Sequence, residues 1–156
     1  MAGRLQAEIK QKKPFARAEV EAFLNLQRTA DALARGLAEA LKPAGLSGPQ
    51  YNILRILRGA GPAGCACREL GERMVTQDPD ITRLLDRLEA RGLVARARGR
   101  EDRRVVVTRI AEKGLRVLAD LDAPLMNLHR RLLGHLGDRR LRALIELLEV
   151  AREKAP

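Results

Sequence analysis

The stretch from 91 to 110, RGLVARARGREDRRVVVTRI, combines the pattern of a β-hairpin with seven arginines. Arg96 and Arg98 alternate with alanines in a strand predicted from about Leu93 to Arg98, so both should project from one face. A second strand is predicted from about Arg104 to Ile110, after the GRED turn. Because like charges repel at such short spacing, the pattern favours neutralisation by phosphates or by a narrow minor groove. The alternative is that the arginines are solubilising edge residues that block strand pairing.

Two short helices with a turn between them are predicted just before this hairpin. The first runs from Cys67 to Met74, with Leu70 and Met74 on its inner side. The second begins near Pro79, and Arg91-Gly92 suits its end, with a cation in the last turn and a glycine past the cap. Its apolar residues follow the helical i, i+3, i+4, i+7 spacing: Ile81, Leu84, Leu85 and Leu88.

The apolar stripe of the second helix leaves a polar face outward, formed by Asp80, Thr82, Arg83, Asp86 and Arg87. Helix, turn, helix and hairpin is the plan of a winged helix-turn-helix, in which such a face enters the major groove. Taken alone, the same face could be a solvated surface, since Asp86 and Glu89 lie beside the arginines.

The rest of the chain is predicted to be helical, in keeping with an aromatic content of only 2%. A polar, basic arm at 1–14 precedes a helix from Phe15 to about Leu41. Another helix runs from Ser47, a plausible N-cap, to about Arg58, and GAGPAG at 59–64 forms a loop. After the hairpin, two helices are predicted, Ala111 to about Leu136 and Arg139 to about Lys154, separated by Gly137-Asp138.

The charge balance indicates a polyanionic partner. Thirty Lys and Arg against 20 Asp and Glu give a net charge of +10 and a pI near 10.7, which favours nucleic acid first and an anionic membrane second. No apolar run reaches the roughly 18 residues of a membrane span, and MAGRLQAEIKQKKP lacks the apolar core of a signal peptide. We therefore expect no membrane partner and a cytoplasmic location.

Catalysis, metal binding and a cofactor are not indicated. The chain lacks a phosphate-cradling glycine loop and a nucleophile elbow, and His129 and His135 are six residues apart, so they share no helix face at i, i+4. Cys65, in a short strand or loop, and Cys67, at the helix cap, are expected to be reduced packing residues, with oxidant sensing as the alternative. RNA binding is disfavoured because the predicted sheet lacks aromatic residues for base stacking.

The stretch LSGPQYNILRIL…CRELGERM…DITRLLDRLEARGLVARARGREDRRVVVTRIAEKG, residues 46–114, resembles the MarR family of winged-helix transcriptional regulators. Thr82 and Arg83 match the family's Thr-Arg pair at the DNA-facing start of its recognition helix. Asp102 and Arg104 match its Asp-x-Arg wing motif, in which the Asp steadies the tip and the Arg enters the minor groove. The candidate DNA-binding residues are Gln77, Asp80, Thr82, Arg83, Arg87, Arg96, Arg98, Arg100, Asp102, Arg103 and Arg104.

After the arm at 1–14, the resemblance implies a dimerisation helix at 15–45, the winged domain at 46–114 and dimerisation helices at 115–156. The Leu and Ala stripes of the terminal helices are longer than a winged domain can cover, which favours a two-fold partner. The implied function is that of a homodimeric repressor that binds a pseudo-palindromic operator and is released by a small aromatic or carboxylate effector. The alternative is a ligand-binding or protein-interaction dimer without operator specificity.

Overall fold

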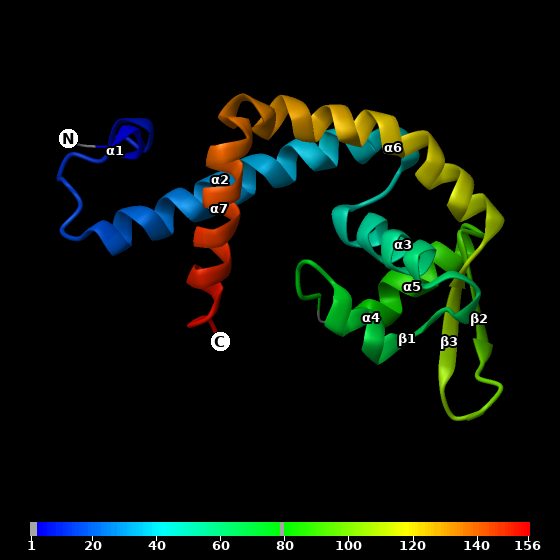
Figure 1. Cartoon of the computed structure of the whole chain (residues 1–156). Helices are drawn as coiled ribbons and strands as arrows, with labels where there is room; N and C mark the ends of the chain where they lie inside the picture. Colours follow the sequence, from blue (N-terminus) through cyan, green and yellow to red (C-terminus); the bar gives the residue numbers. More distant parts are fainter. Residues whose placement is uncertain (1–2, 79) are drawn as a thin grey trace. The chain divides into compact units, whose positions relative to one another are not determined.

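The computed structural model describes residues 3–78 and 80–156, and the chain divides into two compact units, Met1–Gly36 and Leu37–Pro156 (Figure 1). The structure confirms a mainly helical chain with a small antiparallel sheet. The predicted helix start at Pro79 lies outside the described residues.

The first unit contains α1 (Arg4–Glu8) and most of α2 (Ala18–Leu41). The arm predicted over 1–14 contains the short helix α1, in which Leu5 is only 2% exposed. An ion pair between Glu8 Oε2 and Arg28 Nε, 2.9 Å long, links α1 to α2. Helix α2 begins three residues later than predicted, and it exposes the apolar side chains of Val20, Phe23 and Leu26.

Three helices form the core of the second unit: α3 (Gly48–Ala60), α4 (Cys67–Arg73) and α5 (Ile81–Ala90). Ser47 is the N-cap of α3, as predicted: its hydroxyl accepts from the Gln50 N–H at 3.2 Å, and the Gln50 side chain accepts from the Ser47 N–H at 3.0 Å. Cys67 is not the cap of α4, since Ala66 holds that position. The fully buried side chains between these helices are Ile53, Leu54, Leu57, Leu70, Leu85 and Leu88.

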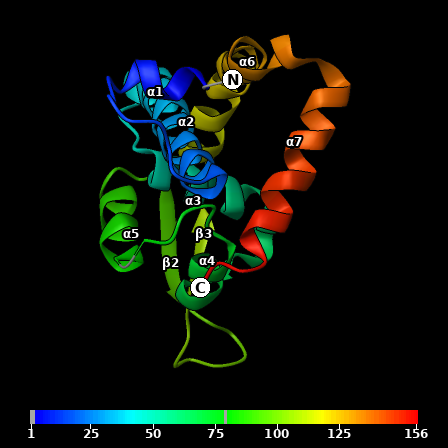
Figure 2. The same ribbon diagram turned by 90° about the vertical axis from the view of Figure 1, so that its left-hand side faces the viewer.

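The predicted hairpin is present as β2 (Val94–Arg98) and β3 (Val106–Ile110). A third strand, β1 (Cys65–Ala66), completes a sheet of order β1-β3-β2, with Arg96 opposite Thr108 in the β2–β3 register. A Cβ on Gly64 would lie 2.4 Å from the Thr108 carbonyl oxygen, so glycine is required for β1 to approach β3. Figure 2 shows the β2–β3 hairpin extending beyond the helices of this unit.

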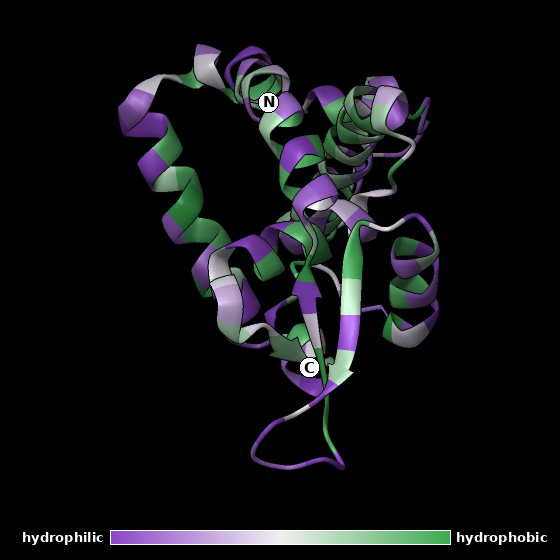
Figure 3. Cartoon of the chain, turned by 90° about the vertical axis from the view of Figure 1, so that its right-hand side faces the viewer, coloured by the Kyte–Doolittle hydropathy of each residue, from purple (hydrophilic) through white to green (hydrophobic). Residues whose placement is uncertain are grey.

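Two helices follow the sheet, α6 (Glu112–Leu133) and α7 (Gly137–Arg152). The inner face of α6 buries Leu118, Leu121, Leu125 and Leu128. The predicted break at Gly137-Asp138 comes earlier, because a 3₁₀ turn at Gly134–Leu136 ends α6 and Gly137, with a φ of 74°, redirects the chain into α7. All residues of α7 are described and none is buried, although apolar residues occur along much of its length (Figure 3). Within the described ranges no helix is long and apolar enough to cross a membrane.

Candidate nucleic-acid interface

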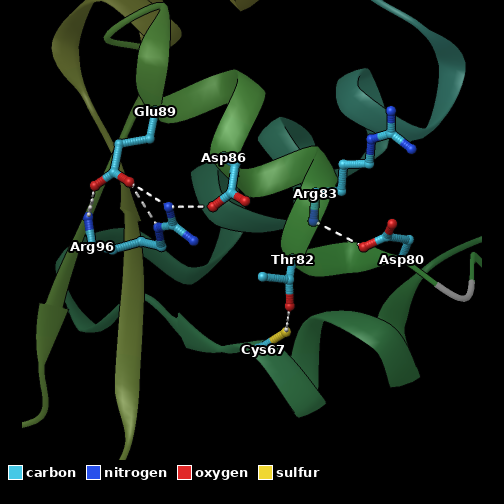
Figure 4. A network of polar contacts seen from close by, with 7 residues as sticks. All are labelled: Cys67, Asp80, Thr82, Arg83, Asp86, Glu89 and Arg96. Carbon is cyan, nitrogen blue, oxygen red and sulfur yellow. Dashed lines mark hydrogen bonds and ion pairs between the residues drawn. The ribbon is translucent and has the colours of Figure 1, made fainter.

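Helix α5 presents a polar face to solvent. Thr82, Arg83, Asp86 and Arg87 are all exposed, while Ile81, Leu85 and Leu88 are buried beneath them. The Asp80 side chain is the N-cap, accepting from the backbone N–H of Arg83 at 3.1 Å (Figure 4). Asp80 was predicted to be a DNA-binding residue. In the structure, one of its two carboxylate oxygens is used to cap the helix.

The turn that leads into α5 is held by α3. The Asn52 side-chain oxygen accepts a hydrogen bond from the backbone N–H of Val75 at 2.8 Å. Gln77 is exposed two residues later. The Thr82 hydroxyl lies 4.0 Å from the Cys67 sulfur, which joins the start of α5 to α4. The sequence reasoning missed Asn52, and no local pattern marks it.

The tip between β2 and β3 is stiffened by its own backbone and by Asp102. Gly99 N–H donates to the Val105 carbonyl at 2.7 Å. One carboxylate oxygen of Asp102 accepts from the Arg104 backbone N–H at 2.9 Å and from its Nε at 3.3 Å. These contacts fit the steadying role that the resemblance implies for Asp102. The Arg104 side chain is 92% exposed. Three further arginines of the wing are exposed: Arg98, Arg100 and Arg103.

Arg96 differs from the other arginines of the wing. It was predicted to act with Arg98, but its side chain is only 23% exposed and is paired with Asp86 and Glu89 of α5. The hydrogen bond from Arg96 lowers the pKa of the Glu89 carboxyl, and the pKa of Arg96 is raised first by Glu89 and then by Asp86. The alternation of β2 identified the face of the strand correctly but not the carboxylates that lie over it.

The two cysteines lie beside this interface. Cys65 is buried, and burial raises the pKa of its thiol, so the sulfur stays protonated near neutral pH and packs in the core. The guanidinium of Arg73 lies 3.4 Å from that sulfur. Cys67 is half-buried. The predicted packing role therefore agrees with the position of Cys65.

A small cavity of about 180 Å³ lies between α3 and α6. Arg58 and Asp122 form a bidentate ion pair at its wall, with hydrogen bonds of 2.9 and 3.0 Å. The guanidinium of Arg55 lies 5.9 Å from the centre of the Tyr51 ring, and burial raises the pKa of the Tyr51 hydroxyl. The lining residues are Tyr51, Arg55, Arg58, Asp122, Leu125, Met126 and His129.

The arrangement of α4, α5 and the β2–β3 hairpin is that of a winged helix-turn-helix domain, the class in which a helix and a basic wing meet nucleic acid together. The sequence profile of the MarR family matches residues 44–105. A solved MarR transcription factor from Planctomyces limnophilus is 43% identical, with 87% of this chain and 98% of that chain covered and a TM-score of 0.68. The chain belongs to the MarR family of transcriptional regulators.

Two further relatives are informative. The uncharacterized HTH-type transcriptional regulator YwoH from Bacillus subtilis is 34% identical over 90 residues, which cover 56% of this chain and 64% of YwoH. The chain thus spans less than two thirds of the length of this curated relative. The structure of CouR from Rhodococcus jostii RHA1, bound to p-coumaroyl-CoA, is 25% identical, with a TM-score of 0.75 over 91% of this chain and 99% of that one.

Proposed function

We propose that the protein is a sequence-specific repressor that binds a pseudo-palindromic operator as a homodimer. The observation that carries this proposal is the pairing of an exposed polar face on α5 with a wing whose arginines Arg98, Arg100 and Arg103 are free for phosphates. In that arrangement Thr82, Arg83 and Gln77 read base edges, and Arg104 enters the minor groove. Arg87 lies one turn after Arg83 and contacts the flanking phosphate.

The apolar faces of the terminal helices support the dimer. In α7, Ile145, Leu147 and Val150 are more than half exposed although the helix is well formed. In α2, Phe23 is 60% exposed. Apolar side chains gathered on one helix in this way call for a partner surface, and a second copy would also supply the second recognition helix for a two-fold operator.

Salt-dependent binding to duplex DNA, followed by protection mapping on the DNA that flanks its own gene, tests the proposal. We expect two protected half-sites about one helical turn apart and no competition from single-stranded RNA. A dimer that binds no duplex above the level of a scrambled sequence would instead support the alternative, a ligand-binding or protein-interaction dimer.

The cavity between α3 and α6 supports release by a small aromatic carboxylate. Its volume of about 180 Å³ is below the roughly 300–1,000 Å³ of drug-sized sites, which suits a single-ring acid. Tyr51 offers an aromatic wall, and Arg55 offers a cation that is not engaged by Asp122. Benzoate should weaken operator binding and its neutral amide should not. Arg55→Ala should lose the response while Arg116→Ala keeps it, and an equal response to both probes would contradict the site.

A further inference from the structure

Arg96 ties the wing, which is the β2–β3 hairpin, to α5, the proposed recognition helix, through two carboxylates (Figure 4). Its Nε donates to Glu89 Oε2 at 2.8 Å, its Nη2 donates to Asp86 Oδ1 at 2.6 Å, and its backbone N–H donates to Glu89 Oε1 at 3.4 Å. Asp86 and Glu89 are one turn apart on α5, so a single planar guanidinium contacts two points along the helix.

Arg98 provides the internal comparison. It lies two residues further along β2, on the same face by strand alternation, and it is exposed. Within residues 3–78 and 80–156, Arg98 has no carboxylate partner, whereas Arg96 faces two. The two carboxylates outweigh the charge of one guanidinium, so this cluster does not attract phosphate as Arg98 does.

The cluster of Arg96, Asp86 and Glu89 lies where it can fix the orientation of the hairpin relative to α5. In the described part of the chain, every ion pair that joins α5 to the strands of the sheet includes Arg96. Arg96 lies in the middle of β2, before the strand continues to the tip that carries Asp102 and Arg104. A rotation of α5 about its axis, or a tilt of the hairpin away from it, would break at least one of the two contacts.

We propose that Arg96 is a positioning residue that fixes the wing relative to the recognition helix. Its ion pairs with Asp86 and Glu89 then determine how strongly the protein prefers its operator over other duplex DNA. The proposal rests on the operator binding proposed above. A base edge and a minor groove lie at a fixed spacing in one duplex, so both contacts form together only when the protein holds the two elements at that spacing. Phosphate binding by the free arginines needs no such precision.

The test compares Arg96→Ala with Arg98→Ala as the matched control. Each variant is titrated, over a series of salt concentrations, with a duplex selected from random DNA by the wild-type protein and with a scrambled duplex of the same length. Thermal unfolding is followed for each variant. Arg96→Ala should weaken binding to the selected duplex about tenfold and leave the scrambled duplex and the salt slope almost unchanged. Arg98→Ala should weaken both duplexes and reduce the slope by about 0.9.

Glu89→Gln makes the test independent of whether Arg96→Ala folds well. If Arg96 positions the wing, Glu89→Gln lowers discrimination like Arg96→Ala. If Arg96 instead binds phosphate, weakening its pairing releases the guanidinium and strengthens binding to every duplex. The charge exchange Arg96→Glu with Glu89→Arg should recover discrimination that each single change loses, because the ion pair is restored with opposite polarity.

The outcomes separate the two proposals. Equal losses on both duplexes with a reduced slope for Arg96→Ala, or an affinity gain for Glu89→Gln, would overturn the positioning role while the wild-type protein still discriminates. A wild-type protein that selects no sequence would overturn the operator proposal, and the positioning role with it.

Discussion

The recognition helix and the wing carry opposite charge balances although they form one interface. From Gln77 to Ala90 there are four acidic residues and two arginines, whereas from Val94 to Ile110 there are two acidic residues and six arginines. The helix is therefore less suited than the wing to attracting phosphates, and we expect most of its polar groups to meet donors and acceptors at chosen bases. From this difference we expect base recognition by the helix and phosphate binding by the wing, with Arg96 joining the two elements as proposed above.

The largest expected effect tests whether the protein binds its operator as a dimer, with two recognition helices and two wings. Leu148 lies half-buried on α7, and Leu148→Asp should dissociate the dimer, because burying an unpaired carboxylate at an apolar interface costs several kcal/mol. Operator binding should be lost, and only weak, salt-sensitive binding through the wing should remain. Sedimentation should give about twice 17.3 kDa for the wild type and for Glu149→Asp, the control. A well-folded wild-type monomer at micromolar concentration would contradict the dimer.

The next effect sharpens the assignment of affinity to the wing. Arg104→Ala should weaken operator binding by roughly 1–3 kcal/mol without loss of the fold, because the side chain is 92% exposed and pairs with the exposed Asp102. Asp102→Ala should do similar harm by releasing the tip. Arg116→Ala, an exposed arginine of α6, serves as the control in fluorescence-anisotropy titrations. Unchanged binding by Arg104→Ala at physiological salt would remove this residue from the interface.

A smaller effect tests the reading role of the helix. Thr82→Ala or Gln77→Ala should change which bases are preferred and should shift discrimination at single positions by about 1 kcal/mol, within the usual range for one base pair. Binding selections on randomised duplexes would measure the shift. If both variants lose affinity equally for all sequences, these residues contact phosphates and do not recognise bases.

The smallest effect concerns pH. The pKa of Glu89 in the folded protein lies below its ordinary value of 4.5, because Arg96 donates to the ionised carboxylate. A depressed pKa stabilises the fold above the unfolded-state value and loses that contribution as pH falls through the folded value. Unfolding curves of the wild type and of Glu89→Gln should therefore differ at neutral pH and converge below about pH 4.5. A difference that grows in acid would contradict the ion pair.

Local sequence patterns predicted most of the fold. The helical spacing of Ile81, Leu85 and Leu88, the stop at Gly92 and the cap at Ser47 each depend on residues within a few positions, and the structure confirms them. Very short elements have too few residues to show a period. The helix α1, with five residues, was not predicted, and β1, with two, was expected only as a short strand or loop at Cys65. The end of α6 was misplaced because Gly134 and Gly137 are both suitable breakers, and residue type alone does not choose between them.

The sequence predicted which residues lie at the candidate interface, but not which side chains they contact. Asp80 stands where an N-cap is expected, so its capping role could have been recognised from the sequence. The pairing of Arg96 could not be derived in the same way, because strand alternation gives a face and not the element that covers it. Two carboxylates three residues apart on the preceding helix, Asp86 and Glu89, were the available signal.

The proposed division between base recognition by the helix and phosphate binding by the wing is tested most directly by the salt dependence of binding in two double variants. One carries Arg98→Ala with Arg100→Ala, and the other carries Gln77→Ala with Thr82→Ala. The wing variant should lose affinity for operator and scrambled duplexes alike and reduce the salt slope by about 0.9 per lost phosphate contact. The helix variant should lose operator preference with an unchanged slope. The same loss of slope in both variants, or of preference in both, would contradict the separation of the two roles.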